Sequence, residues 1–348
     1  MIWLTWRQFR GSATMMAALL VVVAAVMALT GPQIADDYTT GLAKCVQEDT
    51  CAAFFDGFFE ENITPFMVVT LAVLLIPAIA GLFWGAPLIT RELEAGTHLL
   101  VWNQSVTRTR WLAVKLVLTG LAAVGAACVC GLVVTWWSQP LDKSAGPGWA
   151  VMDPLVFSAR GIVPMGYAAF AFVLGVTMGV VFRRTLPAMA LTLAVFAAVQ
   201  VAMPLLVRPH LAAPVTSTFE LSTENVDGIG ISTDGRMRVT VEPVIPGHTG
   251  AWVLTSNVVD SSGKVIDDGK GEAEVKGVSS TSGPCGAPGA GSPNLCNAEI
   301  SRHGYRQLAT YQPLERFWPF QWIETGIYAL LTAGMTGLCF WVVRRRLS

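Results

Sequence analysis

The stretch 62–90, NITPFMVVTLAVLLIPAIAGLFWGAPLIT, runs for 29 residues without a charged side chain. The hydrocarbon core of a bilayer is crossed by about 20 apolar residues in a helix. Because lipid offers the backbone no hydrogen-bond partners, such a stretch satisfies its own peptide groups by forming a helix. The segment therefore predicts a transmembrane helix.

Five further charge-free runs flank this stretch, at residues 11–34, 116–141, 161–182, 185–207 and 325–343. The whole chain of 348 residues is 53% hydrophobic and only 14% charged, against roughly 25% charged in a typical soluble domain. Six such runs exclude a large soluble protein with buried core helices. We expect an all-α membrane protein with six transmembrane helices and, between the fifth and sixth, a β-rich extracytoplasmic domain.

Basic residues predict the orientation of these helices. If the N-terminus is cytoplasmic, eleven basic residues fall near span ends on the inside: Arg7, Arg10, Arg91, Arg108, Arg110, Lys115, Arg183, Arg184, Arg344, Arg345 and Arg346. The two short outer loops carry only Lys44, Lys143 and Arg160, which places both termini inside. The first outer loop is acidic: Asp36, Asp37, Glu48, Asp49, Asp56, Glu60 and Glu61.

The N-terminal segment 1–12 is interpreted as a cytoplasmic interfacial helix, because Ile2, Trp6 and Phe9 share one helical face. A cleaved signal peptide is the alternative for this region, since Arg7 and Arg10 precede an apolar run. The poor cleavage site argues against it, so residues 13–207 are expected to hold the first five transmembrane helices.

Residues 208–320 differ from the rest, being polar and rich in Gly, Ser, Thr and Pro. Alternation over 236–242 after the turn 233–235 predicts a hairpin, and 251–259 with 264–266 predicts another around 261–263. Residues 297–310 are expected to form a helix leading back to the membrane. Residues 321–348 then hold the sixth transmembrane helix and a basic cytoplasmic tail.

Cysteines divide by predicted compartment. Cys45 and Cys51 lie in the first outer loop, and Cys285 and Cys296 lie in the large outer domain. Both pairs sit on the oxidising side and close short loops, which predicts two disulfides. Cysteines at 128, 130 and 339 lie inside spans, where a free thiol behaves as a small apolar group.

The segment 91–110 between the second and third spans carries more than positive charge. On a helix beginning near Arg91, apolar and small residues share one face, while Glu94, His98 and Trp102 share the opposite face. An ordinary positive-inside loop explains the arginines but not the acidic pair or this amphipathic pattern. We interpret the segment as a docking element.

This segment resembles the inner loop of type-2 ABC exporter permeases. The similarity rests on Glu94-x-Gly96-Thr97, an apolar pair, Gln104-Ser105-x-Thr107-Arg108-x-Arg110-Trp111 and Lys115. The closing stretches 311–313, 316–318 and 321–324 and the terminal cluster 344–346 resemble actinobacterial members of that family. In that family the loop forms a coupling helix that docks into the ATP-binding subunit. The resemblance implies coupling residues at Glu92, Glu94, Gly96, Thr97, His98 and Gln104. It also implies a second permease copy or a homologue as partner, in a bacterial plasma membrane.

The chain is not expected to be an enzyme. It has no G-x-x-x-x-G-K-[ST] loop, and its four histidines lie in different segments without a nucleophile or a carboxylate constellation. We expect no cofactor or metal bound by this chain, ATP and Mg in the partner subunit, and no nucleic-acid partner.

The leading function is export of an amphipathic or hydrophobic substrate, driven by a separate ATPase. The alternative is a membrane-anchored sensor or assembly protein whose outer domain binds a ligand. An intramembrane enzyme is a third reading, disfavoured because no polar catalytic group lies in the middle of a span. Arg160 and Glu324, near outer span ends, are interpreted as interfacial anchors rather than as a pair across an outer gate.

Overall fold

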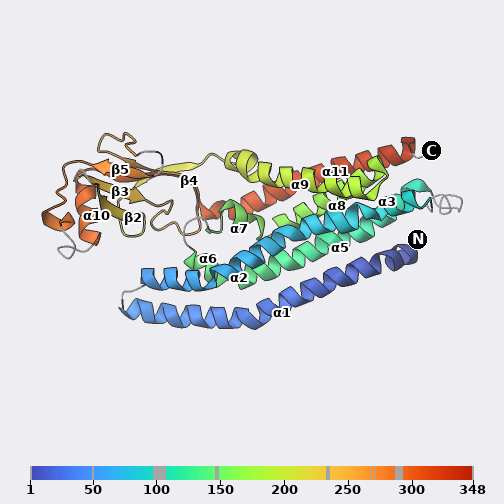
Figure 1. Cartoon of the computed structure of the whole chain (residues 1–348), viewed down its shortest axis with the longest axis horizontal. Helices are drawn as coiled ribbons and strands as arrows, with labels where there is room; N and C mark the ends of the chain where they lie inside the picture. Colours follow the sequence, from blue (N-terminus) through green and yellow to red (C-terminus); the bar gives the residue numbers. More distant parts are fainter. Residues whose placement is uncertain are drawn as a thin grey trace.

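The computed structural model describes residues 2–48, 51–96, 107–145, 149–232, 236–267, 269, 271–286 and 293–346. The chain forms an elongated helical bundle with a β domain at one end and both termini at the other (Figure 1). We call these the domain end and the terminal end. The turn predicted at 233–235 lies outside the described residues.

Six membrane helices build the bundle, and they confirm the six predicted spans within the described residues. The second and fifth spans are each made of consecutive helical pieces that include a π-helix. The spans are α1 (Ile2–Glu48), α2 (Cys51–Ile79) with η1 (Ala80–Gly85) and α3 (Pro87–Glu94), α5 (Arg108–Trp137), α8 (Val163–Phe182), α9 (Thr185–Ala202) with η2 (Met203–Val207) and η3 (Arg208–His210), and α11 (Phe317–Arg346). Residues 2–12 are helical and continue into the span without a break.

Helix α8 is the centre of the bundle, and 15 of its 20 residues are buried. Its small residues allow the second span to approach backbone to backbone. A Cβ on Gly175 would overlap the carbonyl oxygen of Gly81, and one on Gly179 would lie 2.8 Å from the carbonyl oxygen of Ala86. This is the close packing that small residues permit between membrane helices.

We expect Gly175→Ala to destabilise the bundle by about 1–3 kcal/mol, because the added methyl must push η1 away from α8. Gly125→Ala on α5 is the matched control, since nothing lies within 4 Å of a Cβ there. Unfolding of the purified chain in mixed micelles by increasing SDS measures both. Equal stability of the two variants would contradict the packing described for α8.

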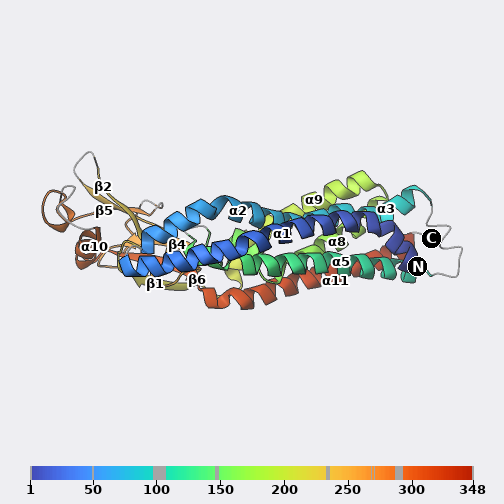
Figure 2. The ribbon, with the colours of Figure 1, turned by 90° about the horizontal axis from the view of Figure 1, so that it is seen from below.

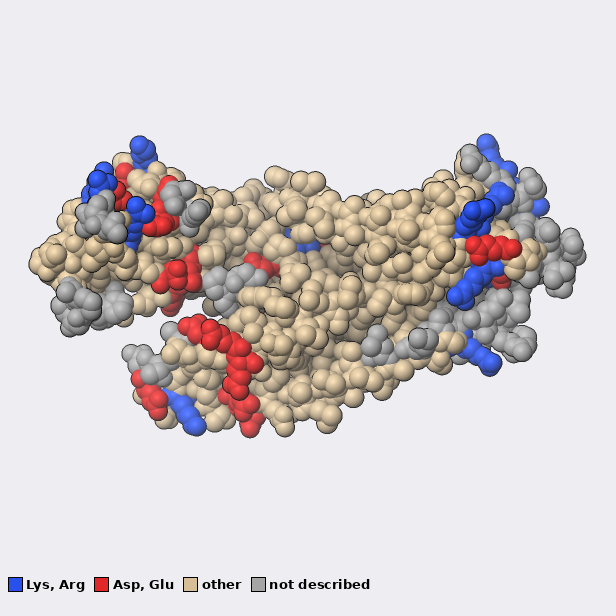
Figure 3. All heavy atoms as spheres, viewed as in Figure 1, with Lys and Arg blue, Asp and Glu red and all other residues tan. Residues whose placement is uncertain are grey.

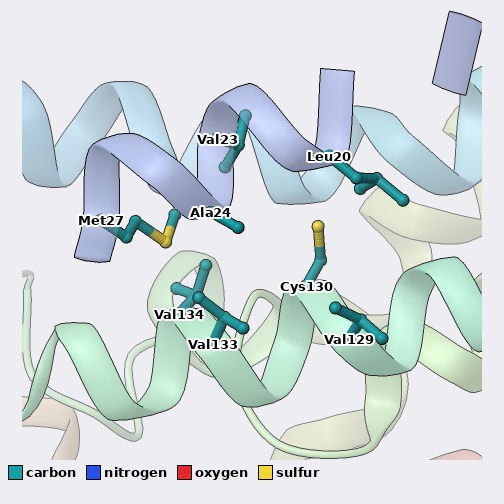
Figure 4. A pocket seen from close by; sticks show the side chains of 8 residues that line it. All are labelled: Leu20, Val23, Ala24, Met27, Val129, Cys130, Val133 and Val134. Atoms are coloured by element: carbon teal, nitrogen blue, oxygen red, sulfur yellow. The ribbon is translucent and has the colours of Figure 1, made fainter. Parts of the chain in front are cut away.

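Helix α1 lies at the edge of the bundle, where most of its apolar residues are not buried, and it packs against α5. Figure 4 shows the gap between the two helices, into which Met27 and Cys130 project among valines. The volume of this gap is only about 10 Å³. This is at the lower limit of the roughly 10–15 Å³ that a single water molecule needs. It is a packing void and not a ligand site.

At the domain end α1 and α2 extend beyond the bundle as a helical hairpin, alongside the β domain (Figure 2). Helix α1 has 47 residues, which at 1.5 Å per residue is roughly 70 Å and exceeds the bilayer core. A disulfide between Cys45 and Cys51 closes the tip, and Tyr38 packs against Phe54 and Phe58 below it. The predicted acidic loop is therefore largely helical.

The β domain contains two three-stranded antiparallel sheets in the described residues. One has the order β1-β6-β4 and the other β2-β3-β5. The strands are β1 (Val215–Phe219), β2 (Val226–Ile231), β3 (Met237–Val241), β4 (Trp252–Val259), β5 (Glu272–Val275) and β6 (Arg306–Gln312). Strands β3 and β4 lie where strands were predicted, and Cys285 and Cys296 form the second predicted disulfide.

The prediction of a helix over 297–310 is wrong in its second half. Helix α10 (Pro293–Arg302) ends before Gly304, whose φ of 90° a helix cannot continue. From Tyr305 to Tyr311 every second side chain is buried, the period of a strand with one face on the core. This segment forms β6, the central strand of its sheet.

Two short helices, α6 (Gln139–Ser144) and α7 (Pro154–Ser158), connect α5 to α8 at the domain end. They lie between the membrane helices and the β domain (Figure 1). A hydrogen bond from Met152 N to Gly250 O, 3.1 Å long, joins this connection to the β domain.

Candidate coupling site

Helix α3 carries the first residues of the predicted docking segment to the terminal end. It begins with Pro87, which suits the first turn of a helix, and ends at Glu94. Gly96 follows with a φ of 67°, a conformation that glycine adopts without strain. The prediction of a helix that begins near Arg91 is therefore wrong in its start, because Arg91 lies inside α3, which begins at Pro87 and ends at Glu94. Thr97, His98 and Gln104 lie outside the described residues.

Glu92 joins α3 to the third span. Its carboxylate lies 2.5 Å from Lys115 Nζ of α5, and both side chains are almost fully buried. Lys115 also donates to the carbonyl oxygen of Leu88, at 3.4 Å. Separating α3 from α5 would leave two buried charges without partners, and this cost keeps the two helices together.

Glu94 joins α3 to the fifth span. Its Oε1 accepts a hydrogen bond from Thr185 N at 2.7 Å, and its Oε2 accepts one from Thr185 Oγ1 at 3.0 Å. Thr185 is the first residue of α9, where a carboxylate satisfies an unpaired N–H and the positive end of the helix dipole. Thr90 Oγ1 lies 2.8 Å from the same hydroxyl. We call Glu92, Glu94, Lys115 and Thr185 the α3 anchor.

The sharp connection between α8 and α9 makes the second half of the anchor possible. Arg183 adopts a left-handed conformation with a φ of 55°, and α9 begins two residues later. Its neighbour Arg184 is exposed, as are Arg91, Arg110 and Arg344. Figure 3 shows that Lys and Arg gather at this terminal end, while the middle of the molecule has hardly any surface charge.

A second polar cluster is buried at the domain end. Arg208 of η3 is fully buried and forms a two-bond ion pair with Glu324 of α11, at 2.9 and 3.0 Å. Arg208 also donates to Ser158 Oγ at 2.9 Å, and Tyr167 OH donates to Glu324 Oε1. We call Arg208, Glu324, Tyr167 and Ser158 the Arg208 cluster. It joins the ends of α9, α11, α7 and α8.

The interpretation of Arg160 and Glu324 as interfacial anchors is wrong, and they do not pair with each other. Both are buried, at 1% and 0% exposure. Glu324 pairs with Arg208, and Arg160 lies 3.6 Å from Asp142 of α6 and over the ring of Phe66. Charges removed from water need such partners, which the fold supplies from other helices.

Sequence reasoning missed Arg208, Tyr167 and Thr185 as partners. The only signal in the sequence was the position of Arg208 directly after a charge-free run, where a buried charge is costly unless it is paired. Thr185 gave no signal, because its role depends on the tight turn at Arg183.

Comparison with known families identifies the membrane part of the chain. Residues 17–208, more than half of the chain, match the model of a family described as ABC-2 membrane transporter related. The matched range covers the first five spans, with the α3 anchor and Arg208, and stops before the β domain. No curated protein and no solved structure matches the chain significantly.

Proposed function

Since the chain belongs to the ABC-2 membrane transporter related family, we propose that it is the membrane-spanning permease subunit of an ABC exporter. A separate ATP-binding subunit would hydrolyse ATP, and two permease chains, identical or homologous, would enclose the path. The terminal end would face the cytoplasm of a bacterium and the β domain the outside, in accord with the basic residues at the terminal end.

The α3 anchor is the observation that carries this proposal. Glu92 attaches α3 to α5, Glu94 attaches it to α9, and glycine packing attaches η1 to α8. A force applied by an ATPase to residues 91–110 would therefore act on the second span and on the three spans attached to it. The second and fifth spans each contain a π-helix, η1 and η2, a feature often found at functional sites.

An apolar groove between α2, α7 and α9 supports an amphipathic or hydrophobic cargo. It has a volume of about 470 Å³ and is lined almost entirely by apolar side chains, including Leu74, Phe196 and Leu205. Two polar residues line it, Ser158 with a hydroxyl group and Gln200 with an amide group. Few polar groups in a largely apolar site are typical of sites for small amphipathic ligands.

Purification of the intact complex from its native membrane in mild detergent tests the proposal. We expect a chain with a phosphate-binding loop to co-purify in stoichiometric amount, and ATP hydrolysis to elute with it. A membrane-anchored sensor predicts neither result. A well-folded chain recovered without an ATP-binding chain and without ATP hydrolysis would overturn the proposal.

A further inference from the structure

A small cavity lies where the β domain meets the α6–α7 connection. Its volume is about 170 Å³, and its walls are Ala145, Ala150 and Asp153 on one side and the segment 243–253 on the other. A single water needs roughly 10–15 Å³ of such space. The cavity therefore has room for a small organic group.

Asp153 is the charged group of this cavity. Its side chain is 9% exposed, and Oδ2 accepts a hydrogen bond of 2.6 Å from Ala150 N. No ion pair to Asp153 occurs among the residues that the structure describes. Asp142, eleven residues earlier, has Arg160 as its partner, so the fold does pair a neighbouring buried carboxylate.

Burial raises the pKa of the Asp153 carboxyl to about 6, and the hydrogen bond from Ala150 opposes this only in part. The group is therefore mostly ionised at neutral pH, buried, and without a neutralising side chain. Keeping a buried carboxylate ionised without a partner costs free energy, and a bound cation would offset this cost. Buried groups of this kind concentrate at functional sites.

The rest of the lining determines which cation fits. Besides Asp153, the lining includes the apolar residues Val244, Ile245, Ala251 and Val253, together with His248 and Thr249. Clusters of three or more metal-ligating side chains are absent from the described residues. A metal ion would therefore lack ligands, whereas an ammonium group attached to an apolar body would find both a carboxylate and a contact surface.

The surroundings favour positive ligands as well. Figure 3 shows the domain end hollowed between the β domain and the α1–α2 hairpin, with acidic side chains on both walls. Burial, and then the carboxylates of Asp227 and Asp56, raise the pKa of Glu242, which precedes the cavity-lining Pro243. Carboxylates of both walls thus lie close enough to repel one another, and their field concentrates cations near the cavity.

We propose that this cavity binds the primary ammonium group of a small alkyl or aryl amine, with Asp153 as its counter-ion. The site does not depend on the exporter function, because a sensor with the same domain would bind the same ligand. Its position between α7 and the β domain would let the amine strengthen the contact between these two parts, which Met152 and Gly250 already make.

Ligand-dependent thermal stability of the complete chain in lipid nanodiscs tests the site. Benzylammonium is the probe, and benzyl alcohol is its neutral counterpart of similar shape. We expect benzylammonium to raise the unfolding temperature in a saturable way and benzyl alcohol to have little effect, because binding to the folded state alone stabilises it. Equal effects of the two compounds, or no effect of benzylammonium, would overturn the proposal.

Variants locate the effect. Asp153→Asn keeps the shape and the acceptor for Ala150 N but removes the charge, and should raise the half-saturating concentration about tenfold or more. Glu299→Gln, which removes a carboxylate of α10 that is paired with Arg302 and lies outside the cavity lining, should leave it within about twofold. If Asp153→Asn does not fold, Ala251→Leu, which adds a larger side chain to the cavity lining and leaves Asp153 in place, should abolish the shift. Unchanged binding in Asp153→Asn or in Ala251→Leu would refute the site.

Discussion

Replacing Arg208 with Met should lower the free energy of unfolding by about 3–5 kcal/mol, the cost of leaving one member of a buried ion pair without its partner. Glu324 would then be fully buried with only Tyr167 as a hydrogen-bond donor among the described residues. SDS-induced unfolding of the purified chain in mixed micelles measures the loss. The expected effect is large because Arg208 binds groups from α7 and α11 simultaneously.

Two further variants separate this explanation from a general effect of losing an arginine. Arg208→Met combined with Glu324→Leu removes both charges and should recover most of the lost stability, since an apolar pair can replace a buried ion pair. Arg238→Met breaks an exposed ion pair with Glu272 and should cost less than about 1 kcal/mol. If the double variant is no more stable than Arg208→Met, the assignment of the Arg208 cluster fails.

Reversing the charge of Glu94 should uncouple ATP hydrolysis from the permease while leaving the chain folded. Glu94→Lys removes two hydrogen bonds to Thr185 and places a cation at the N-terminus of α9. The cost to folding is on the order of 1–2 kcal/mol, as for the loss of a helix cap with an unfavourable dipole contact. We expect permease-stimulated ATP hydrolysis to fall about tenfold or more, because α3 loses its attachment to α9 and, in the proposed complex, a cation replaces the carboxylate offered to the ATP-binding subunit.

Matched variants show which property of Glu94 matters. Glu94→Gln keeps an acceptor for Thr185 N, and should retain most of the stimulated hydrolysis if capping of α9 is the main role. Glu61→Lys makes the same charge change at an exposed position on the hairpin at the opposite end, and should have no effect on hydrolysis. Normal stimulated hydrolysis in Glu94→Lys would show that the α3 anchor does not transmit coupling.

The sequence was sufficient for features that depend on local composition. Each span was visible because lipid requires a long run without charge, and both disulfides were visible because their cysteines lie only six and eleven residues apart. Strands β3 and β4 followed from alternation next to turn residues. Strand β6 shows no such alternation in its sequence, because the polar Gln307 lies on the buried face while the apolar Leu308 lies on the other face.

Features that depend on how distant segments meet could not be predicted. Arg208 and Glu324 are 116 residues apart, and Glu94 and Thr185 are 91 apart. Charge-free runs specify that helices cross a membrane but not which faces they present to one another. Glu94 was therefore interpreted as a contact for a partner, whereas the structure first gives it a contact within the chain.

Site-specific photo-crosslinking tests most directly whether the segment 91–110 docks on an ATP-binding subunit. A photoreactive amino acid is placed at His98 in the intact complex in native membranes, with the same substitution at Glu61 as control. The proposed function predicts a crosslinked product from His98 that contains the ATP-binding chain, and none from Glu61. A product with that chain from Glu61 and not from His98 would contradict both the orientation of the chain and its coupling role.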